Sequence, residues 1–280
     1  MEVDVLGIKF KNPIIIASGP GGNGKELIDY IDLSQLGGFT TKTITFKPKI
    51  GNPPPRIINI KNGVINSIGL ENSGFESFLK DDVPFLEELD TNVIASIGGY
   101  NTEEFCYMIK SLNHTNIKMF ELNLSCPNVD KGGDTILNDL RETKEIIRRA
   151  SKITQKPLFV KLGIEGNLEQ LAKLAIENGA DGLVLINAPK GTKINLKNES
   201  NPEELLRGYG GVSGPIIKPL ALGCIYRVKN IFPNVPIIGM GGVVCKADVL
   251  EFLKAGATLV GIGYGVMMDP ELPINIIREL

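Results

Sequence analysis

Short runs of apolar residues alternate along the chain with longer segments in which apolar residues recur at every third or fourth position. The short runs are nearly continuous in Val, Ile and Leu, which is typical of parallel strands buried on both faces. Eight such strands are expected, at Pro13–Ile16, Gly38–Thr43, Val93–Ser96, Met119–Asn123, Leu158–Leu162, Gly182–Ile186, Pro236–Met240 and Leu259–Ile262.

Amphipathic helices are expected between most of these strands, because apolar stripes with a period of 3.6 residues lie there. Two of the stripes consist of Leu140, Thr143, Ile147 and Ala150, and of Leu168, Leu171, Ala172 and Ala175. One unit also recurs: Ala175–Asn187 and Phe252–Gly263 both run from a helix through Gly-Ala into a strand. The recurrence indicates a fold built from repeated strand–helix units.

This alternation predicts an α/β fold, and the repeated unit favours a closed (β/α)₈ TIM barrel over a doubly wound open sheet, which is the alternative. The opening segment Glu2–Pro13 predicts a small hairpin at the barrel floor. No linker or low-complexity tract divides the 280 residues, and one barrel often fills ~250 residues. Residues 1–280 are therefore expected to form a single domain.

Composition narrows the classes of function. Thirty Lys and Arg stand against 32 Asp and Glu, a formal charge of −2, which argues against a nucleic-acid partner. No apolar run approaches the ~18 residues of a membrane span, and the N-terminus has no features of a signal peptide. The four cysteines lack C-x-x-C spacing, so no metal site is expected. These features predict a cytoplasmic protein.

Polar residues and glycines stand where the predicted strands end. In a barrel, chemistry is placed at these ends and in the loops that follow them. Lysines and asparagines at the ends of buried strands are costly unless they are paired, so a ligand is expected there. The residues concerned are Ser18, Lys42, Thr43, Ser96, Asn123, Lys161, Asn187, Gly241, Gly242 and Gly263.

Glycine-rich turns end the last two strands, at Gly239–Val243 and Gly261–Gly265. Glycines there let backbone N–H groups approach an anion, and phosphate sites after strands 7 and 8 recur among barrels. The two turns together predict phosphate binding.

The first loop, Ser18–Glu26, contains two other glycine motifs that we interpret as a turn. Its G-x-G-x-x-G pattern would need an acidic residue about 20 positions later, where Lys42 and Thr43 stand instead. Its G-x-x-x-x-G-K pattern is followed by Glu26, and a P-loop would need Ser or Thr at that position to bind magnesium. A P-loop NTPase is thus disfavoured.

The segment Glu121–Asn128, "ELNLSCPN", is the most informative stretch. Asn123 ends a buried strand, and Cys126 follows on a loop stiffened by Pro127. A cysteine in such a place can act as nucleophile or base, although most lone cysteines are inert packing residues. From the residues alone, both readings of Cys126 stay open.

Two lysines and a set of amides suggest the ligand. Lys161 could form a Schiff base, or it could be a fixed cation that faces an anionic cofactor. With Lys42 beside the same phosphate site, an anionic cofactor is favoured. Amides supply both donors and acceptors, which suits the edge of a pyrimidine-like ring. Those considered are Asn66, Asn123, Asn128 and Asn187.

At these residues the whole chain resembles class 1 dihydroorotate dehydrogenase, an FMN-dependent (β/α)₈ enzyme of pyrimidine (UMP) synthesis. The segments that match, in order, are "NPIIIASG", "TTKTIT", "GNPPPRI", "GVINSIGLENSGF", "ELNLSCPN", "VKLG", "GGVSGPIIKPLAL" and "IIGMGGV". The segments "TTKTIT" with "GNPPPRI", and "GGVSGPIIKPLAL", look most like the two-subunit, NAD-linked subclass. That resemblance implies a homodimer or a heterotetramer with a partner subunit that carries FAD and a [2Fe–2S] cluster.

The resemblance also implies a role for each matching residue. Cys126 would be the base that takes a proton from C5 of dihydroorotate, and Lys161 would stabilise the reduced, anionic flavin at its N1–O2 edge. Contacts to FMN are expected from Ser18, Lys42, Thr43, Ser96, Asn123, Lys161, Ile186, Gly214, Gly241, Gly242, Gly263 and Tyr264. Contacts to the substrate are expected from Lys42, Asn66, Ser67, Ile68, Gly69, Leu70, Asn123, Asn128, Asn187 and Ala188.

Three positions depart from the family pattern. Ala188 stands where a substrate-binding Thr or Ser is usual, Ser96 replaces an Asn near the flavin, and Tyr264 follows Gly263 where Thr is usual. A lost hydrogen bond that leaves a buried partner unpaired costs ~1–3 kcal/mol. Three alternatives therefore stay open: a related dihydropyrimidine dehydrogenase, a non-catalytic or otherwise divergent flavin-barrel relative, and, more distantly, a Schiff-base aldolase that uses Lys161.

Overall fold

The computed structural model describes residues 1–124, 127–128, 134–196, 205 and 208–280. Within these ranges the eight predicted apolar runs all form parallel strands, and each strand pairs with the strands before and after it in the chain. The strands are β3 (Ile14–Ile16), β4 (Gly38–Thr40), β8 (Asn92–Gly98), β9 (Met119–Asn123), β12 (Leu158–Leu162), β13 (Gly182–Leu185), β16 (Ile237–Met240) and β17 (Leu259–Ile262).

The sheet closes on itself. β17 pairs with β3 and β4 pairs with β8, so the ring has no open edge, and the short β5 (Ile44–Thr45) adds a second pairing to β8. The closed ring confirms the predicted (β/α)₈ barrel and excludes the doubly wound sheet. Because side chains alternate across a strand, Glu121 and Asn123 of β9 share one face of the barrel wall.

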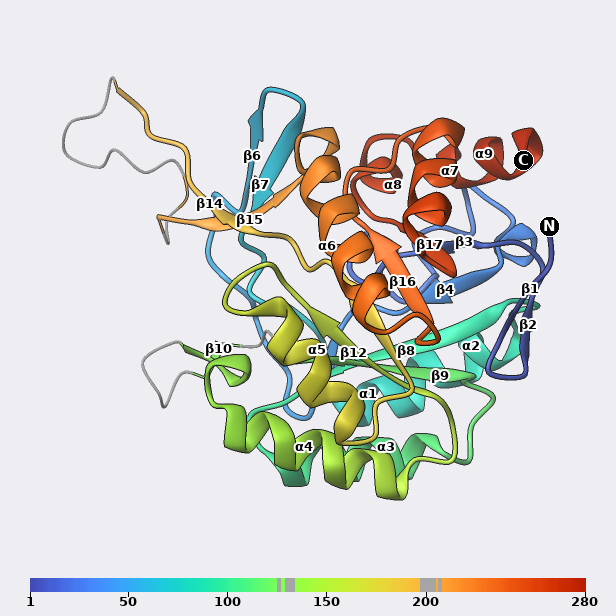
Figure 1. Ribbon diagram of the computed structural model, residues 1–280, viewed down its shortest axis with the longest axis vertical. Helices are drawn as coiled ribbons and strands as arrows, with labels where there is room; N and C mark the ends of the chain where they lie inside the picture. Colours follow the sequence, from blue (N-terminus) through green and yellow to red (C-terminus); the bar gives the residue numbers. More distant parts are fainter. Residues whose placement is uncertain (125–126, 129–133, 197–204, 206–207) are drawn as a thin grey trace.

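Helices surround the barrel (Figure 1). The stripe Leu168, Leu171, Ala172 and Ala175 is buried on α5, and Thr143, Ile147 and Ala150 are buried on α4, whereas Leu140, predicted to belong to the same stripe, is exposed. The helices are α1 (Phe75–Ser77), α2 (Val83–Glu88), α3 (Thr102–Leu112), α4 (Leu140–Ile153), α5 (Leu168–Glu177), α6 (Lys218–Ile231), α7 (Lys246–Ala255), α8 (Tyr264–Met268) and α9 (Leu272–Glu279). No helix in the described ranges is long and apolar enough to cross a membrane.

Shorter turns of helix complete the connections, as η1 (Leu33–Gln35), a π-helical turn (Phe78–Asp82), η4 (Ile136–Asn138) and η5 (Pro215–Ile217). The connection between β3 and β4, which the structure describes in full, is made of turns and η1 rather than an α-helix. The first strand–helix unit is therefore irregular. Its glycine-rich loop begins at the strand end, beside the site described below.

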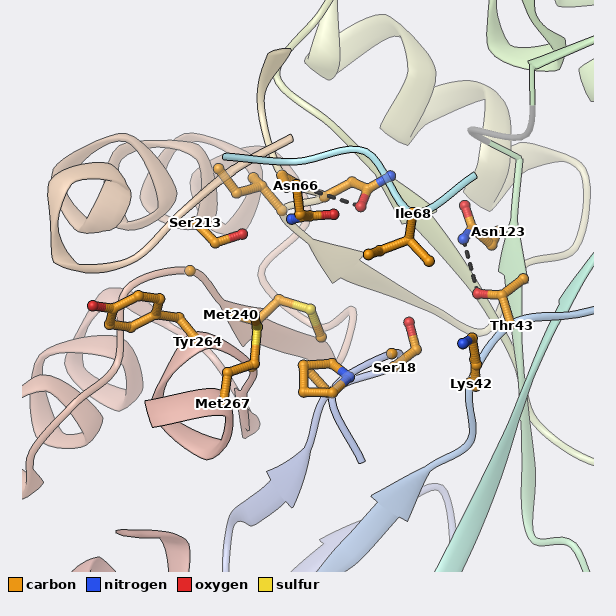
Figure 2. A pocket seen from close by; sticks show the side chains of 18 of the residues that line it. Ser18, Lys42, Thr43, Asn66, Ile68, Asn123, Ser213, Met240, Tyr264 and Met267 are labelled. Atoms are coloured by element: carbon orange, nitrogen blue, oxygen red, sulfur yellow. Dashed lines mark hydrogen bonds between the residues drawn. The ribbon is translucent and has the colours of Figure 1, made fainter. Parts of the chain in front are cut away.

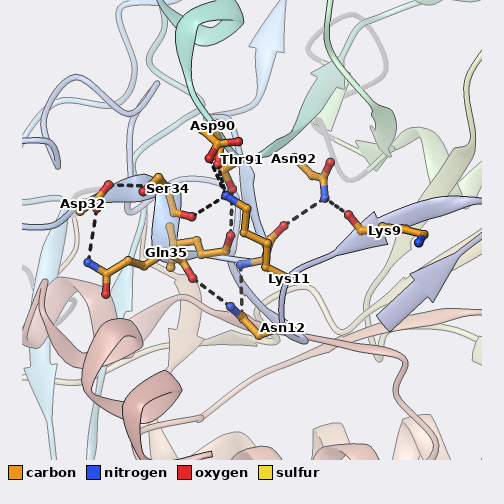
Figure 3. Close-up of polar contacts among 11 residues, drawn as sticks. Lys9, Lys11, Asn12, Asp32, Ser34, Gln35, Asp90, Thr91 and Asn92 are labelled. Atoms are coloured by element: carbon orange, nitrogen blue, oxygen red, sulfur yellow. Dashed lines mark hydrogen bonds and ion pairs between the residues drawn. The ribbon is translucent and has the colours of Figure 1, made fainter. Parts of the chain in front are cut away.

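The predicted N-terminal hairpin is present and covers the barrel floor. β1 (Val3–Val5) pairs antiparallel with β2 (Ile8–Phe10), and Val5 and Phe10 join the cluster of apolar side chains inside the barrel. Lys11 and Asn12, which follow the hairpin, join it to the neighbouring loops (Figure 3). Lys11 Nζ donates to the carbonyl oxygens of Ser34 and Asp90, and the Asn12 amide donates to the carbonyl of Gln35.

A second, antiparallel sheet was not predicted. Its strand order is β14 (Lys190–Gly191), β15 (Gly210–Ser213), β7 (Gly63–Asn66) and β6 (Ile57–Ile60), and it stands beside the barrel in Figure 1. Its segments interrupt two strand–helix connections and bring Asn66 opposite Gly211. A short ladder of β10 (Pro127–Asn128) and β11 (Asp134–Thr135) lies in a third connection.

Candidate functional site

A cavity of about 540 Å³ opens where the barrel strands end. This volume falls within the range of small-molecule sites, ~300–1,000 Å³. Its walls are formed by residues in the last positions of β9, β12 and β16 and by residues that follow β3, β4, β13, β16 and β17, and the added sheet contributes Ile57, Asn66 and Ser213. Figure 2 shows Ser18, Lys42, Thr43 and Asn123 on one side of the cavity and Tyr264 and Met267 on the other.

Most of the residues predicted for the site line this one cavity, although they come from loops far apart in the sequence. Those that line it are Ser18, Lys42, Thr43, Asn66, Ile68, Leu70, Asn123, Lys161, Ile186, Asn187, Ala188, Gly214, Gly241, Gly242, Gly263 and Tyr264.

The other predicted residues lie elsewhere. Ser67 and Gly69 belong to the same loop as Ile68 but face Asn52, whose amide donates to the Ser67 hydroxyl at 2.9 Å. Ser96 is fully buried behind Thr43 and is absent from the lining. Cys126 lies outside the described residues, and so does the side chain of Asn128, whose backbone belongs to β10.

A chain of buried polar side chains runs behind the cavity wall. The Asn123 amide donates to Thr43 Oγ1 at 3.0 Å, Thr43 Oγ1 and Ser96 Oγ lie 2.9 Å apart, and Ser96 Oγ donates to Glu121 Oε1 at 2.7 Å. Lys161 Nζ lies 3.5 Å from the same Glu121 oxygen and donates to Ser18 Oγ at 2.8 Å. Buried polar groups that are satisfied in this way hold their side chains in one arrangement.

The two predicted lysines differ in their surroundings. The side chain of Lys161 is 5% exposed and is paired with Glu121. Lys42 lines the cavity, and its backbone N–H donates to the Gly22 carbonyl, but its ammonium makes no hydrogen bond or ion pair with any part of the chain that the structure describes. A half-buried ammonium without a counter-charge favours an anionic ligand. The cavity is therefore suited to bind negative charge on the Lys42 side.

A glycine cradle forms the opposite wall, made by Gly214 before η5 and by Gly241 and Gly242 after β16. Gly241 and Gly242 have φ of 128° and 86°, which favours glycine. A Cβ on Gly242 would approach Gly214 O at 2.8 Å, so side chains cannot fit between the two loops. The wall is consequently backbone, and concave backbone of this kind binds phosphate.

An ion pair fixes the loop that carries Gly241 and Gly242. Asp248 of α7 accepts Lys218 Nζ at 2.7 Å and the N–H groups of Val244 and Cys245 at 2.8 and 3.1 Å. Burial would raise the pKa of Asp248, but these hydrogen bonds outweigh burial and hold the pKa below its ordinary value. The hydrogen bonds of Lys218 Nζ to Asp248 and to Glu251 raise the pKa of Lys218. The pair thus joins the beginnings of α6 and α7 beside the cradle.

Sequence reasoning missed several residues of the site. Arg56 lines the cavity and donates to Glu71 Oε2 at 2.6 Å, and Met240, Ile217 and Met267 supply apolar surface. The segment "GNPPPR" contains Arg56, but nothing in its local pattern indicates that this side chain lines the cavity. Glu121 was also missed, although its place two residues before Asn123 on a buried strand would have put it on the same face.

A phosphate-bearing planar cofactor fits this arrangement. The backbone cradle suits a phosphate, while the buried Lys161 and the apolar Ile186 and Met240 suit a ring that carries negative charge at one edge. The remaining space near Lys42, Asn66 and Asn187 offers a cation and amides to a smaller second ligand.

Comparisons with known proteins bear on this cavity. Residues 1–280 match the family model described as dihydroorotate dehydrogenase. Two similar relatives are named dihydroorotate dehydrogenase B (NAD(+)), catalytic subunit: one from Alkaliphilus metalliredigens, 39% identical, and one from Thermoanaerobacter sp. (strain X514), 41% identical. Each match covers 100% of this chain and 92% of the relative.

The fold has a counterpart among solved structures. A crystal structure of DHODH from Eimeria tenella in complex with ferulenol superposes with a TM-score of 0.79. The match covers 99% of this chain and 82% of the Eimeria tenella chain, at 22% sequence identity. At that identity the likeness supports the barrel fold alone.

Proposed function

The chain belongs to the dihydroorotate dehydrogenase family, and we propose that it oxidises dihydroorotate to orotate in pyrimidine synthesis with FMN as its cofactor. The observation that carries the proposal is that a backbone cradle, a buried lysine and a lysine without a counter-charge line one cavity. The family membership favours this oxidoreductase over the Schiff-base aldolase considered for Lys161.

The cofactor would be held by residues of the cavity wall. FMN, when bound, supplies the acceptor for the hydride from C6 of dihydroorotate. Gly214, Gly241, Gly242 and Gly263 would hold its phosphate through backbone contacts. Lys161 would place its ammonium at the N1–O2 edge of the ring, where charge develops on reduction. Ser18, Thr43, Ile186 and Tyr264 would line the rest of that space, and Ser96 would act from behind through Thr43.

The substrate would be held by its carboxylate and its ring edge. Lys42 and Asn66, with the backbone of residues 67–70, would hold the carboxylate. Asn123, Asn128 and Asn187 would bind the donors and acceptors of the pyrimidine edge, with Ala188 beside them. Cys126 would remove the proton at C5, for which it must be at least partly thiolate.

The natural electron acceptor is proposed to be NAD⁺, reached through a partner subunit with FAD and a [2Fe–2S] cluster. The support is that both relatives are named as catalytic subunits and as NAD(+)-linked. We further propose that residues 1–280 act as one domain and that the chain works as a homodimer or within a heterotetramer. A purified chain that reduces NAD⁺ efficiently by itself would contradict the partner proposal.

The test is a visible spectrum of the purified chain before and after anaerobic addition of dihydroorotate. The proposal predicts a flavin spectrum that bleaches. A flavin spectrum that persists would retain the cofactor and reject the substrate. A protein that takes up no added FMN would reject the proposed function altogether.

A further inference from the structure

Glu121 is a buried carboxylate that the proposed function leaves without a role. It is 1% exposed and lies on β9, inside the barrel, between Ser96 on β8 and Lys161 on β12. A buried carboxylate is costly unless it is paired and hydrogen-bonded. An apolar residue at this position of a barrel wall rich in Ile, Leu and Val would avoid that free-energy cost. The buried charge therefore indicates that Glu121 has a role.

The contacts of Glu121 show what it acts on. Its Oε1 receives the Ser96 hydroxyl at 2.7 Å and lies 3.5 Å from Lys161 Nζ, which donates at 2.8 Å to the cavity-lining Ser18. Lys161 therefore stands between the carboxylate behind the wall and the cavity in front of it. Because the Ser96 hydroxyl donates its hydrogen bond to Glu121, the Thr43 hydroxyl must donate to Ser96, and the Thr43 oxygen in turn accepts the Asn123 amide. This relay fixes the position of the carboxylate.

We propose that Glu121 is a positioning residue that sets the effective charge of Lys161 toward the cofactor. The inference rests on the proposed function, in which Lys161 faces the edge of FMN that becomes negative on reduction. A lone buried lysine would bind the reduced form much more tightly than the oxidised form. The adjacent carboxylate offsets part of that attraction and keeps the midpoint potential of the bound cofactor lower than an unpaired lysine would make it.

The test is the midpoint potential of bound FMN, measured by anaerobic reductive titration against a reference dye. Glu121→Gln keeps the size of the side chain and an oxygen that can accept from Ser96, but it removes the charge. We expect it to favour the reduced form about tenfold more than wild type does, which raises the potential by ~30 mV for a two-electron couple. Lys161→Met should lower the potential, and the double variant should return it toward the wild-type value.

The opposite signs and their cancellation separate this role from a structural one. A merely structural role would weaken cofactor binding in every variant without moving the potential up in one and down in the other. If Glu121→Gln does not fold, the double variant carries no unpaired buried charge, and its potential should exceed that of Lys161→Met. Glu103→Gln is the matched control: it removes the carboxylate from the Glu103–Arg149 ion pair, whose residues do not line the cavity, and we expect its potential to equal that of wild type.

Each outcome decides the inference. A wild-type chain that binds FMN, with the same potential in Glu121→Gln, would overturn the role of Glu121 and leave the proposed function intact. A lower potential in Glu121→Gln would overturn it equally. A wild-type chain that takes up no FMN would overturn the proposed function, and the inference with it.

Discussion

At the scale of single residues, the two lysines of the site differ, because one is paired with a carboxylate and the other is not. Lys161 is held by Glu121 and Ser18, whereas the ammonium of Lys42 has no ion-pair or hydrogen-bond partner among the described residues. The first suits a permanent neighbour such as a cofactor, and the second suits a ligand that comes and goes with its own negative charge. This difference favours the proposal that Lys42 binds the substrate.

Lys42→Met tests that assignment. A charge-assisted hydrogen bond contributes ~1.5–3 kcal/mol, so its loss should weaken orotate binding about 10- to 100-fold. Orotate affinity can be followed by the change in the flavin spectrum on titration, and FMN should stay bound. The reverse pattern, in which FMN is lost and orotate affinity is kept, would assign Lys42 to the cofactor instead.

Cys126 is tested by removal of its thiol. Cys126→Ala should keep the flavin spectrum but slow the reduction of the flavin by dihydroorotate by roughly 10²–10⁴-fold, as expected for a lost general base. Anaerobic stopped-flow absorbance measures that rate. Cys126→Ser is the control, because a hydroxyl can retain part of the activity. Reduction at nearly the normal rate in Cys126→Ala would reject the assignment.

At the scale of elements, Asp248 links the cradle to the rest of the barrel. The Asp248→Asn variant loses the charge that pairs with Lys218 and should lower the free energy of unfolding at pH 7 by about 2 kcal/mol, between the values for exposed and fully buried pairs. Urea unfolding measures this. Glu251→Gln is the control: Glu251 also pairs with Lys218 but is half-exposed, so we expect a loss under ~1 kcal/mol.

The loss of stability in Asp248→Asn is expected to depend on pH. Because the folded-state pKa of Asp248 lies below its ordinary value of 3.8, the ionised carboxylate contributes its full stability above that value. That contribution falls as pH drops through the lower, folded-state pKa. The difference in unfolding free energy between wild type and Asp248→Asn should therefore shrink below about pH 4. A difference that grows on acidification would contradict the direction of the shift.

Strands and helices differ in how far the sequence predicts them. The barrel strands follow from apolar runs such as Leu158–Leu162, since burial on both faces leaves a strong local signal. The sheet of β14, β15, β7 and β6 leaves none, because its strands are short, partly polar, and paired between residues as distant as Asn66 and Gly211. Local pattern cannot reveal pairings of that separation.

The site shows the same limit. Polar residues at strand ends could be predicted, and the barrel brings them into one cavity because parallel strands end at the same rim. Ser96 was expected to touch the cofactor, but it lies behind Thr43 and bonds to Glu121. Its register opposite Glu121 on a neighbouring strand depends on the closed sheet, which no single segment specifies.

At the scale of the whole molecule, stability and function occupy opposite ends of the barrel. The hairpin and the contacts of Lys11 and Asn12 close the floor, while the cavity opens where the strands end (Figures 2 and 3). Such a division is general for this fold. Substitutions at the barrel floor should therefore change the free energy of unfolding without changing the affinity for ligands.

Asn12→Ala tests the division. The buried Asn12 side chain accepts the N–H groups of Ile14 and Gly37 and donates to the Gln35 carbonyl, so its loss should cost ~2–3 kcal/mol of unfolding free energy. Lys11→Met is the exposed control and should cost less than ~1 kcal/mol. FMN affinity should be unchanged in both variants. A large loss of cofactor affinity in Asn12→Ala would show that the floor and the site are coupled.

The central claim is that one cavity holds FMN beside a substrate recognised through its carboxylate. The most direct test compares the anaerobic rates at which dihydroorotate and dihydrouracil, which lacks the carboxylate, bleach the bound flavin. The account predicts rapid bleaching by dihydroorotate, slow bleaching by dihydrouracil, and a much smaller difference in Lys42→Met. Equal rates for the two compounds in the wild-type chain, or faster bleaching by dihydrouracil, would contradict it.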